Sequence, residues 1–125
     1  AYNFNSGALK SALKAKPTSR ARQAAQLQAT FTISENPIAS SGKKVVYMQI
    51  QGPSGKTFQR MSSYLMETED GSVAYTEKKE IDYQNKAIDI SIYYDIREDN
   101  LAKGNYKVNI YCDENLIGSD SFTLK

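Results

Sequence analysis

The stretch AIDISIYYDI, residues 87–96, alternates large apolar side chains with polar ones or tyrosine. Successive side chains of an extended chain point to opposite faces, so a period of two collects the apolar residues on one face. That face holds Ile88, Ile90, Ile92, Tyr94 and Ile96. The pattern predicts a β-strand that a core covers on one side.

The same alternation recurs in four other stretches of the chain. They are LQATFTIS (27–34), KVVYMQIQ (44–51), YKVNIYC (106–112) and LIGSDSFTL (116–124). Weaker strand patterns lie in TFQRMSSYLM (57–66) and VAYTEKKEIDYQ (73–84), and turn-forming sequences separate the strands. Short strands at close spacing, with no helical pattern between them, predict an all-β, immunoglobulin-like β-sandwich of about seven antiparallel strands over residues 26–125.

Residues 1–25 have a different composition, rich in Ala, Ser and Lys and interrupted by Gly7 and Pro17. The stretch ALKSALKAK (8–16) has helical character but spans too few turns to be a stable helix alone in water. We therefore expect a flexible or partly helical N-terminal arm that acts as a basic connector.

Charge is distributed unevenly, although the formal net charge is only +2. Residues 1–34 contain no acid and five cations: Lys10, Lys14, Lys16, Arg20 and Arg22. A basic arm of this kind can touch nucleic acid or an anionic lipid surface. Because these charges are sparse and no aromatic side chain lies between them, we interpret the arm as a solvated connector and expect no nucleic-acid binding.

The composition argues against most catalytic and metal-binding chemistry. The chain has no histidine, so it lacks the commonest general base and a common zinc ligand. The turn ETEDGS offers Glu67, Glu69 and Asp70 as oxygen ligands, but its spacing does not match a Ca²⁺ loop and Asp-Gly is ordinary turn chemistry. We expect no catalytic residue, no enzymatic activity, no cofactor and no metal, and we leave Ca²⁺ binding at this turn open.

Four residues near the C-terminus are expected to be structural. Cys112, the single cysteine, shares its parity with Tyr106 and should face the core as a small apolar side chain rather than a reactive thiol. The stretch LAKGNY (101–106) resembles the tyrosine corner of immunoglobulin-like and fibronectin-like domains, in which a tyrosine hydroxyl bonds back to nearby backbone. The resemblance implies that Leu101, Gly104 and Tyr106 build this corner.

Three tyrosines are predicted to point away from the core and are candidates for contact with a partner. In an immunoglobulin-like order, Tyr47 and Tyr93 would lie on the outer face of one sheet, and Tyr111 would point outward from the other sheet. An exposed tyrosine combines a rigid apolar body with a polar tip, which suits protein contacts. The alternative is that these side chains cover their own sheets by cross-strand pairing.

A wider resemblance covers most of the chain. Three stretches, AYNFNSGALK (1–10), FTISENPIASSGKKVVYMQIQGPSGK (31–56) and GNYKVNIYCDENLIGSDSFTLK (104–125), resemble uncharacterised envelope proteins of Bacteroidetes type. Those proteins combine an N-terminal anchor, a coiled coil, a basic connector and a C-terminal immunoglobulin-like domain. The resemblance implies a periplasmic or cell-envelope location in a bacterium and membrane attachment only through an upstream anchor. The chain begins with Ala rather than Met, so we expect a processed product or an excised fragment.

The function we expect is that of a non-catalytic protein-binding or structural module. Its contacts would be made through exposed tyrosines or through edge strands that accept an added strand. A C-terminal secretion or sorting domain, a carbohydrate-binding module and an unrecognised enzyme with a carboxylate-lined pocket are the alternatives. The partner is expected to be a protein, and the sequence fixes neither its identity nor the oligomeric state.

Overall fold

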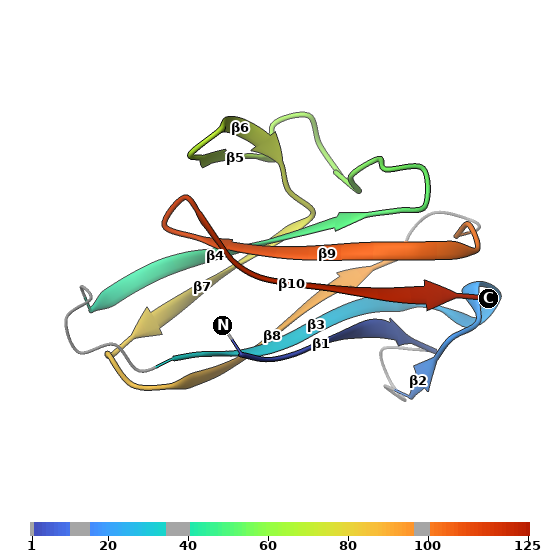
Figure 1. Cartoon of the computed structure of the whole chain (residues 1–125), viewed down its shortest axis with the longest axis horizontal. Coiled ribbons are helices and arrows are strands. Elements are labelled where there is room, and N and C mark those ends of the chain that lie inside the picture. The colour runs from blue at the N-terminus through green and yellow to red at the C-terminus, as the bar shows by residue number, and fades with distance from the viewer. Residues whose placement is uncertain (1, 11–15, 35–40, 97–100) are drawn as a thin grey trace.

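The computed structural model describes residues 2–10, 16–34, 41–96 and 101–125, and its two main sheets pack face to face (Figure 1). Sheet A consists, in order, of β2 (Pro17–Thr18), β1 (Tyr2–Leu9), β3 (Gln26–Ile33) and β8 (Ile88–Asp95). Sheet B consists, in order, of β10 (Asn115–Leu124), β9 (Gly104–Cys112), β4 (Gly42–Gln51) and β7 (Glu77–Tyr83). A separate hairpin pairs β5 (Leu65–Thr68) with β6 (Gly71–Ala74), and a short 3-10 helix, η1 (Ala21–Gln23), precedes β3.

The core lies between the two sheets and is formed by the apolar residues that the alternation assigns to the inner faces. At most 2% of each side chain is exposed for Leu27, Ala29, Phe31, Val46, Met48, Ile50, Val108 and Ile110. The inward face predicted for residues 87–96 is also correct, because Ile90, Ile92 and Tyr94 are buried and the flanking isoleucines pack against them. All pairings within the sheets are antiparallel. The expected all-β sandwich resembling the immunoglobulin-like fold is confirmed.

The N-terminal segment is where the structure departs from the expected arm. Residues 2–9 form β1, which pairs with β3 and buries Ala8 and Leu9. Phe4 stacks on Phe31, with their ring centroids 5.6 Å apart. The expectation of a flexible or partly helical arm is wrong for the described part of this segment, because β3 supplies both backbone partners and an apolar surface. Residues 11–15, inside the stretch with helical character, lie outside the described residues.

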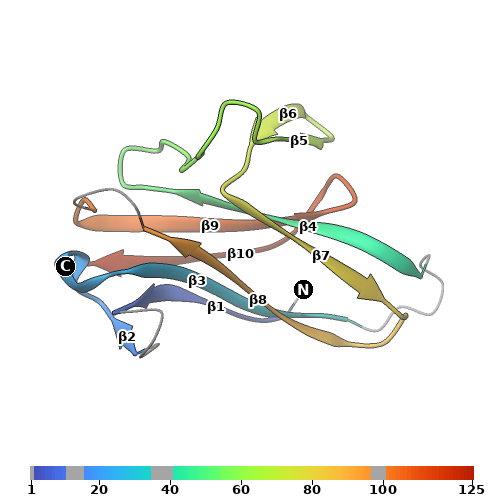
Figure 2. The same ribbon diagram turned by 180° about the vertical axis from the view of Figure 1, so that it is seen from behind.

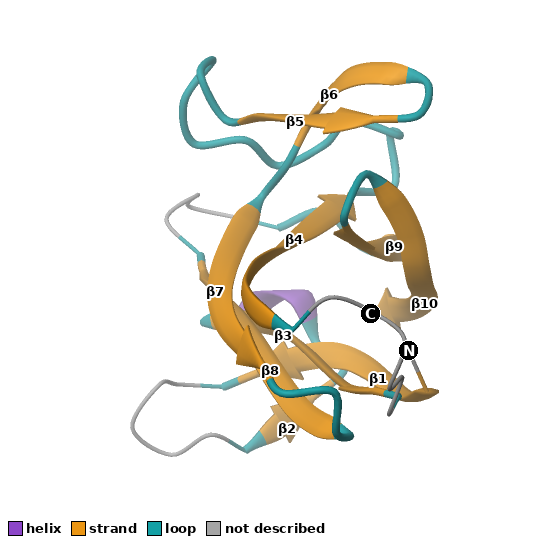
Figure 3. Ribbon diagram, turned by 90° about the vertical axis from the view of Figure 1, so that its left-hand side faces the viewer, coloured by secondary structure: helices purple, strands orange, loops and turns teal. Residues whose placement is uncertain are grey.

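The hairpin of β5 and β6 stands outside the sandwich, over the outer face of sheet B (Figures 1 and 3). We call residues 61–75, which include this hairpin, the β5–β6 lobe. The reverse view shows β7 and β8 running along the same side of the molecule, one in each sheet (Figure 2). The first weak strand pattern, at 57–66, corresponds to a loop that leads into β5. The second, at 73–84, corresponds to the end of β6 and to β7.

Candidate functional site

The three candidate tyrosines do not form the surface that the sequence predicts. Tyr47 of β4 and Tyr111 of β9 are direct cross-strand partners in sheet B, and both are half-buried. Tyr93 lies on β8 in sheet A and is 45% exposed. The predicted sharing of one sheet by Tyr47 and Tyr93 is thus wrong, because β8 pairs with β3 and alternation fixes a residue's face without fixing its sheet.

The β5–β6 lobe already covers the tyrosine on the outer face of β4. The Tyr75 ring packs edge-on against Tyr47 and stacks on Tyr64, with 4.9 Å between ring centroids in each pair. Met66 is 2% exposed and Tyr75 is 5% exposed, and burial raises the pKa of Tyr75. Aromatic pairs at this spacing add to the stability gained from area burial. The lobe of the same chain therefore covers the face of Tyr47 that the sequence assigns to a partner.

A line of side-chain hydrogen bonds fixes the lobe to sheet B. Ser119 Oγ donates to Asn109 Oδ1 (2.8 Å), and Asn109 Nδ2 donates to Gln49 Oε1 (3.0 Å). Gln49 Nε2 then donates to the backbone carbonyl of Ala74 in the lobe (2.9 Å). Gln49 and Asn109 are each only 7% exposed, so losing one partner leaves a buried amide unsatisfied. The sequence alone does not predict this network, because both residues have outward parity, which ordinarily indicates exposure to solvent.

The outer side of the lobe presents apolar and acidic groups to solvent. Met61 is 57% exposed and Leu65 is 52% exposed. At the tip, Thr68 Oγ1 donates to the Gly71 carbonyl (2.8 Å) and accepts from the Asp70 N–H (3.2 Å), so the turn is closed by its own hydrogen bonds. Within the described residues, no group of three or more His, Cys, Asp or Glu is placed to hold a metal ion.

The edge strand β8 is protected against strand addition by two cations. Lys79 Nζ donates to the outward carbonyl of Ser91 (3.0 Å), and Arg60 Nη2 donates to the carbonyl of Asp95. The Arg60 guanidinium also lies 4.4 Å from the centre of the Tyr94 ring, which holds it in place. An incoming strand would have to displace both charged groups from the carbonyls that it needs as acceptors.

The predicted tyrosine corner is geometrically complete. The Tyr106 hydroxyl donates to the Ala102 carbonyl (2.5 Å), and Tyr106 is fully buried. Leu101 is buried next to this turn, and Gly104 has a φ of 135°, a conformation that L-residues with a side chain rarely adopt. These residues hold the connection into β9 rather than any reactive group.

Cys112 lies at the end of β9 and is 8% exposed, as its parity predicts. Burial, and to a smaller extent the charge of Asp113, raises the pKa of the Cys112 thiol. A raised thiol pKa lowers the thiolate fraction at neutral pH, and the thiolate is the nucleophile. The environment therefore favours a structural cysteine.

Residues 2–125 match the protein family described as Domain of unknown function (DUF8428). The chain belongs to this family. A comparison with curated proteins finds no match for the DUF8428 domain.

Solved structures that superpose on this chain share little sequence identity with it. The DUF8428 domain superposes on a β-glucosidase from Kluyveromyces marxianus with a TM-score of 0.53 and 10% identity, covering 98% of this chain and 14% of that one. For an immunoglobulin-like protein from Pseudomonas aeruginosa, the TM-score is 0.45 and the identity is 13%, and the match covers 100% of this chain and 94% of that one. For the alkylpurine DNA glycosylase AlkC from Pseudomonas fluorescens, the TM-score is 0.47 and the identity is 17%, and the match covers 80% of this chain and 26% of that one. The chain thus spans about a quarter or less of the glycosylase and the glucosidase, and the likeness concerns the fold alone.

Two further observations bound the chemistry of the DUF8428 domain. No helix in the described part of the chain is long and apolar enough to cross a membrane. Among the described residues, no buried side-chain nitrogen or oxygen lacks a hydrogen-bond partner, so no buried polar group is left aimed at a ligand. Any binding role would therefore be expected at the surface rather than at a buried polar group.

Proposed function

We propose that this DUF8428 domain is a non-catalytic protein-binding module of a bacterial cell-envelope protein, and that the β5–β6 lobe makes the contact. The observation that carries the proposal is the pair Met61 and Leu65, which stay more than half exposed on an element whose inner side is buried. The two residues lie four positions apart in one lobe, and large apolar side chains that a fold holds in solvent on one element are candidates for a contact surface.

The architecture of the lobe supports a binding role. Met66 and Tyr75 bury the inner side of the lobe, and Gln49 ties it to sheet B, so its outer side is presented on a fixed support. A fixed contact surface loses little conformational entropy when a partner binds. The strands of sheet B therefore serve as the scaffold, and the lobe serves as the contact.

The charge of the lobe indicates the chemistry of the partner. Glu67, Glu69 and Asp70 lie at or next to the tip and are exposed, and Glu67 accepts a hydrogen bond from Ser72. A matching surface would offer an apolar hollow for Met61 and Leu65 with basic groups around it. The resemblance to envelope proteins supports an envelope location for that partner.

Photo-cross-linking in cells of the native host tests this proposal. A photoreactive amino acid is placed at Leu65 in the full-length protein, and the same residue is placed at Leu116 as the matched control. The two leucines are equally exposed, at 52% and 53%, but Leu116 belongs to β10, the edge strand that β9 separates from β4, and not to the lobe. We expect a discrete adduct with an envelope protein from position 65 only, and we expect Met61→Ser to weaken it.

An adduct from position 116 without one from position 65 would contradict the assignment of the lobe. Adducts from both positions with the same set of abundant proteins would show collision rather than binding. The absence of any adduct from position 65 would also reject the proposal.

A carbohydrate-binding role is not favoured by the described concavities. One of about 600 Å³ lies beside the Gly52–Gly55 turn and is lined by polar groups, including Lys107 and Asp120. Its aromatic lining residue, Tyr106, is fully buried by the corner and offers no face for a sugar ring to stack on. No described feature favours a secretion or sorting role over the binding role.

A further inference from the structure

Four cations from separate parts of the chain line one concavity at an end of the sandwich. Arg20 and Arg22 flank or belong to η1, Lys103 precedes β9, and Lys125 follows β10. The concavity has a volume of about 240 Å³, and among the described residues these four line it. Folding has thus brought the basic N-terminal segment together with two lysines from the last quarter of the sequence.

Hydrogen bonds fix the backbone of the segments that carry these cations. The Lys125 N–H donates to the Ser19 carbonyl (2.6 Å), and the Ala21 N–H donates to the Lys125 carbonyl (2.9 Å). The bond from the Tyr106 hydroxyl to Ala102 fixes the residue before Lys103. The backbone positions of the cations are therefore set before any ligand arrives, which lowers the entropic cost of binding.

The four cations have no acidic partners among the described residues. The ion pairs among the described residues involve other cations, and they join Lys43 to Glu80, Lys44 to Asp113 and Arg60 to Glu77. Asp95, an acid near this end, accepts a hydrogen bond from Gln26. Like charges held close together destabilise the folded state, so this arrangement is one that a bound anion would stabilise.

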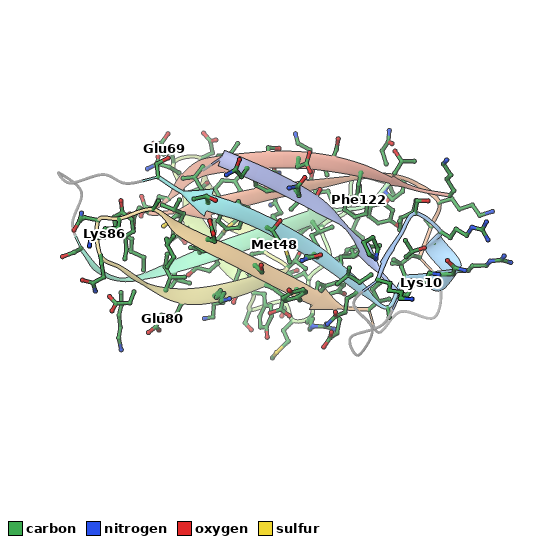
Figure 4. The ribbon with its side chains drawn as sticks, turned by 90° about the horizontal axis from the view of Figure 1, so that it is seen from below. Lys10, Met48, Glu69, Glu80, Lys86 and Phe122 are labelled. Carbon is green, nitrogen blue, oxygen red and sulfur yellow. The ribbon has the colours of Figure 1, made fainter. Side chains whose placement is uncertain are left out.

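Further positive charge lies on the same end of the molecule. Lys10 and Lys16 are exposed there, joined by a backbone hydrogen bond from the Lys10 N–H to the Lys16 carbonyl (2.8 Å). Figure 4 shows long, nitrogen-tipped side chains projecting from the end that carries the label Lys10, whereas Glu69, Glu80 and Lys86 mark the other end. Lys14, Arg97, Glu98 and Asp99 lie outside the described residues.

We propose that this concavity, which we call the basic pocket, binds a phosphate group. The planar guanidinium groups of Arg20 and Arg22 match the oxygen geometry of phosphate, and the two lysines add charge from two other segments of the chain. A volume of about 240 Å³ lies below the range of about 300–1,000 Å³ typical of pockets for drug-sized ligands, so the pocket suits a compact anion.

The source of the phosphate is either a soluble phosphate compound or a phospholipid headgroup. Both present the same group to the four cations, and the experiment distinguishes them. A nucleic-acid strand requires a longer basic track with aromatic side chains on which bases stack, and the lining residues that the structure describes include no aromatic side chain.

Amide NMR spectra recorded during titration with sodium pyrophosphate test the proposal. We expect saturable shifts centred on the amides of Ala21, Arg22, Lys103 and Lys125, in a buffer whose ionic strength is kept constant with sodium chloride. The double variant Arg20→Gln/Arg22→Gln should weaken binding by about tenfold or more, since each hydrogen bond to a charged group is worth about that factor. Lys103→Gln/Lys125→Gln provides an independent second variant, because it removes the two pocket cations that come from the last quarter of the sequence.

The matched control removes the same charge elsewhere. Lys78→Gln/Lys86→Gln replaces two exposed cations outside the pocket and should bind pyrophosphate as the wild type does. Co-sedimentation with phosphatidylcholine vesicles, with and without phosphatidylglycerol, forms the second arm. Binding to anionic vesicles alone, lost in the arginine variant, assigns the phosphate to a headgroup.

Three outcomes would overturn the proposal. One is the absence of a saturable response to both pyrophosphate and anionic vesicles. Another is an equal loss of binding in the control variant, which would show a diffuse charge effect. The third is tighter binding of a single-stranded oligonucleotide than of pyrophosphate, with shifts spread beyond the pocket.

Discussion

Gly104→Ala should destabilise the domain strongly, because two separate penalties coincide at this residue. The φ of Gly104 is 135°, in a region that side chains of L-residues disfavour. A Cβ at this position would also lie 3.0 Å from both Cβ and Cγ of Pro53. Contacts this short require the proline ring or the β9 backbone to move.

The two penalties can be estimated separately. A residue held in a sparsely populated backbone region costs about 1–3 kcal/mol. An added methyl group in a packed site costs about 1–3 kcal/mol more. At a urea m-value of about 1–3 kcal/mol/M, a total loss of about 3 kcal/mol lowers the midpoint of unfolding by roughly 1–3 M.

Two other glycines separate the contributions when urea unfolding is followed by circular dichroism. Gly42 has a φ of 121° but no atom within 4 Å of the added Cβ, so Gly42→Ala reports the backbone penalty alone. Gly7 has neither feature, so Gly7→Ala should leave the midpoint nearly unchanged. We expect the largest loss for position 104, a smaller one for 42 and the smallest for 7. A Gly104→Ala midpoint equal to that of Gly42→Ala would refute the contact with Pro53.

Three other predictions concern single side chains. Tyr106→Phe should cost about 1 kcal/mol in urea unfolding, because the hydrogen bond to Ala102 is lost while the ring stays packed. Cys112 should react with a disulfide reagent much more slowly in the native protein than in urea, because burial shields the thiol and raises its pKa; equal rates would contradict its burial. The hydrogen bond to Asp113 raises the pKa of Lys44 above its ordinary 10.5, so the ion pair stabilises the fold below pH 10.5 and this contribution is lost as the pH rises further. The difference in unfolding midpoint between wild type and Lys44→Met should therefore shrink above pH 10.5; a constant difference would mean that the pair contributes nothing.

The strands of the core could be predicted because their signal is local. In β8, Ile90 and Ile92 alternate with Asp89 and Ser91, and each side chain needs only its own parity to find the correct face. The first strand lacks such a signal. Residues 2–9 contain Gly7 and two asparagines, and the pairing with β3 shifts register between residues 2 and 5, so alternation is broken where β1 begins.

The candidate surface could be predicted only in part, because it depends on contacts between distant segments. Parity placed Tyr47 outward correctly, but nothing near Tyr47 in the sequence shows that Tyr75 will cover it. Likewise the N-terminal sequence gave no sign that Lys103 and Lys125 would lie beside Arg20 and Arg22, because Lys125 reaches them only when the end of β10 pairs with Ser19 and Ala21. Local patterns determine faces, whereas sheet order and long-range neighbours come from the tertiary fold.

The hydrogen bonds from Lys79 and Arg60 to the carbonyls of β8 have a consequence for aggregation at high protein concentration. Exposed backbone on a straight outer strand is the template on which molecules add to one another into fibrous aggregates. Two positive charges seated on that backbone repel the same charges on a neighbouring copy and withhold the acceptors that fibre growth uses. Resistance to aggregation at high local concentration is thus tied to two side chains, one of which, Arg60, also packs against the buried ring of Tyr94.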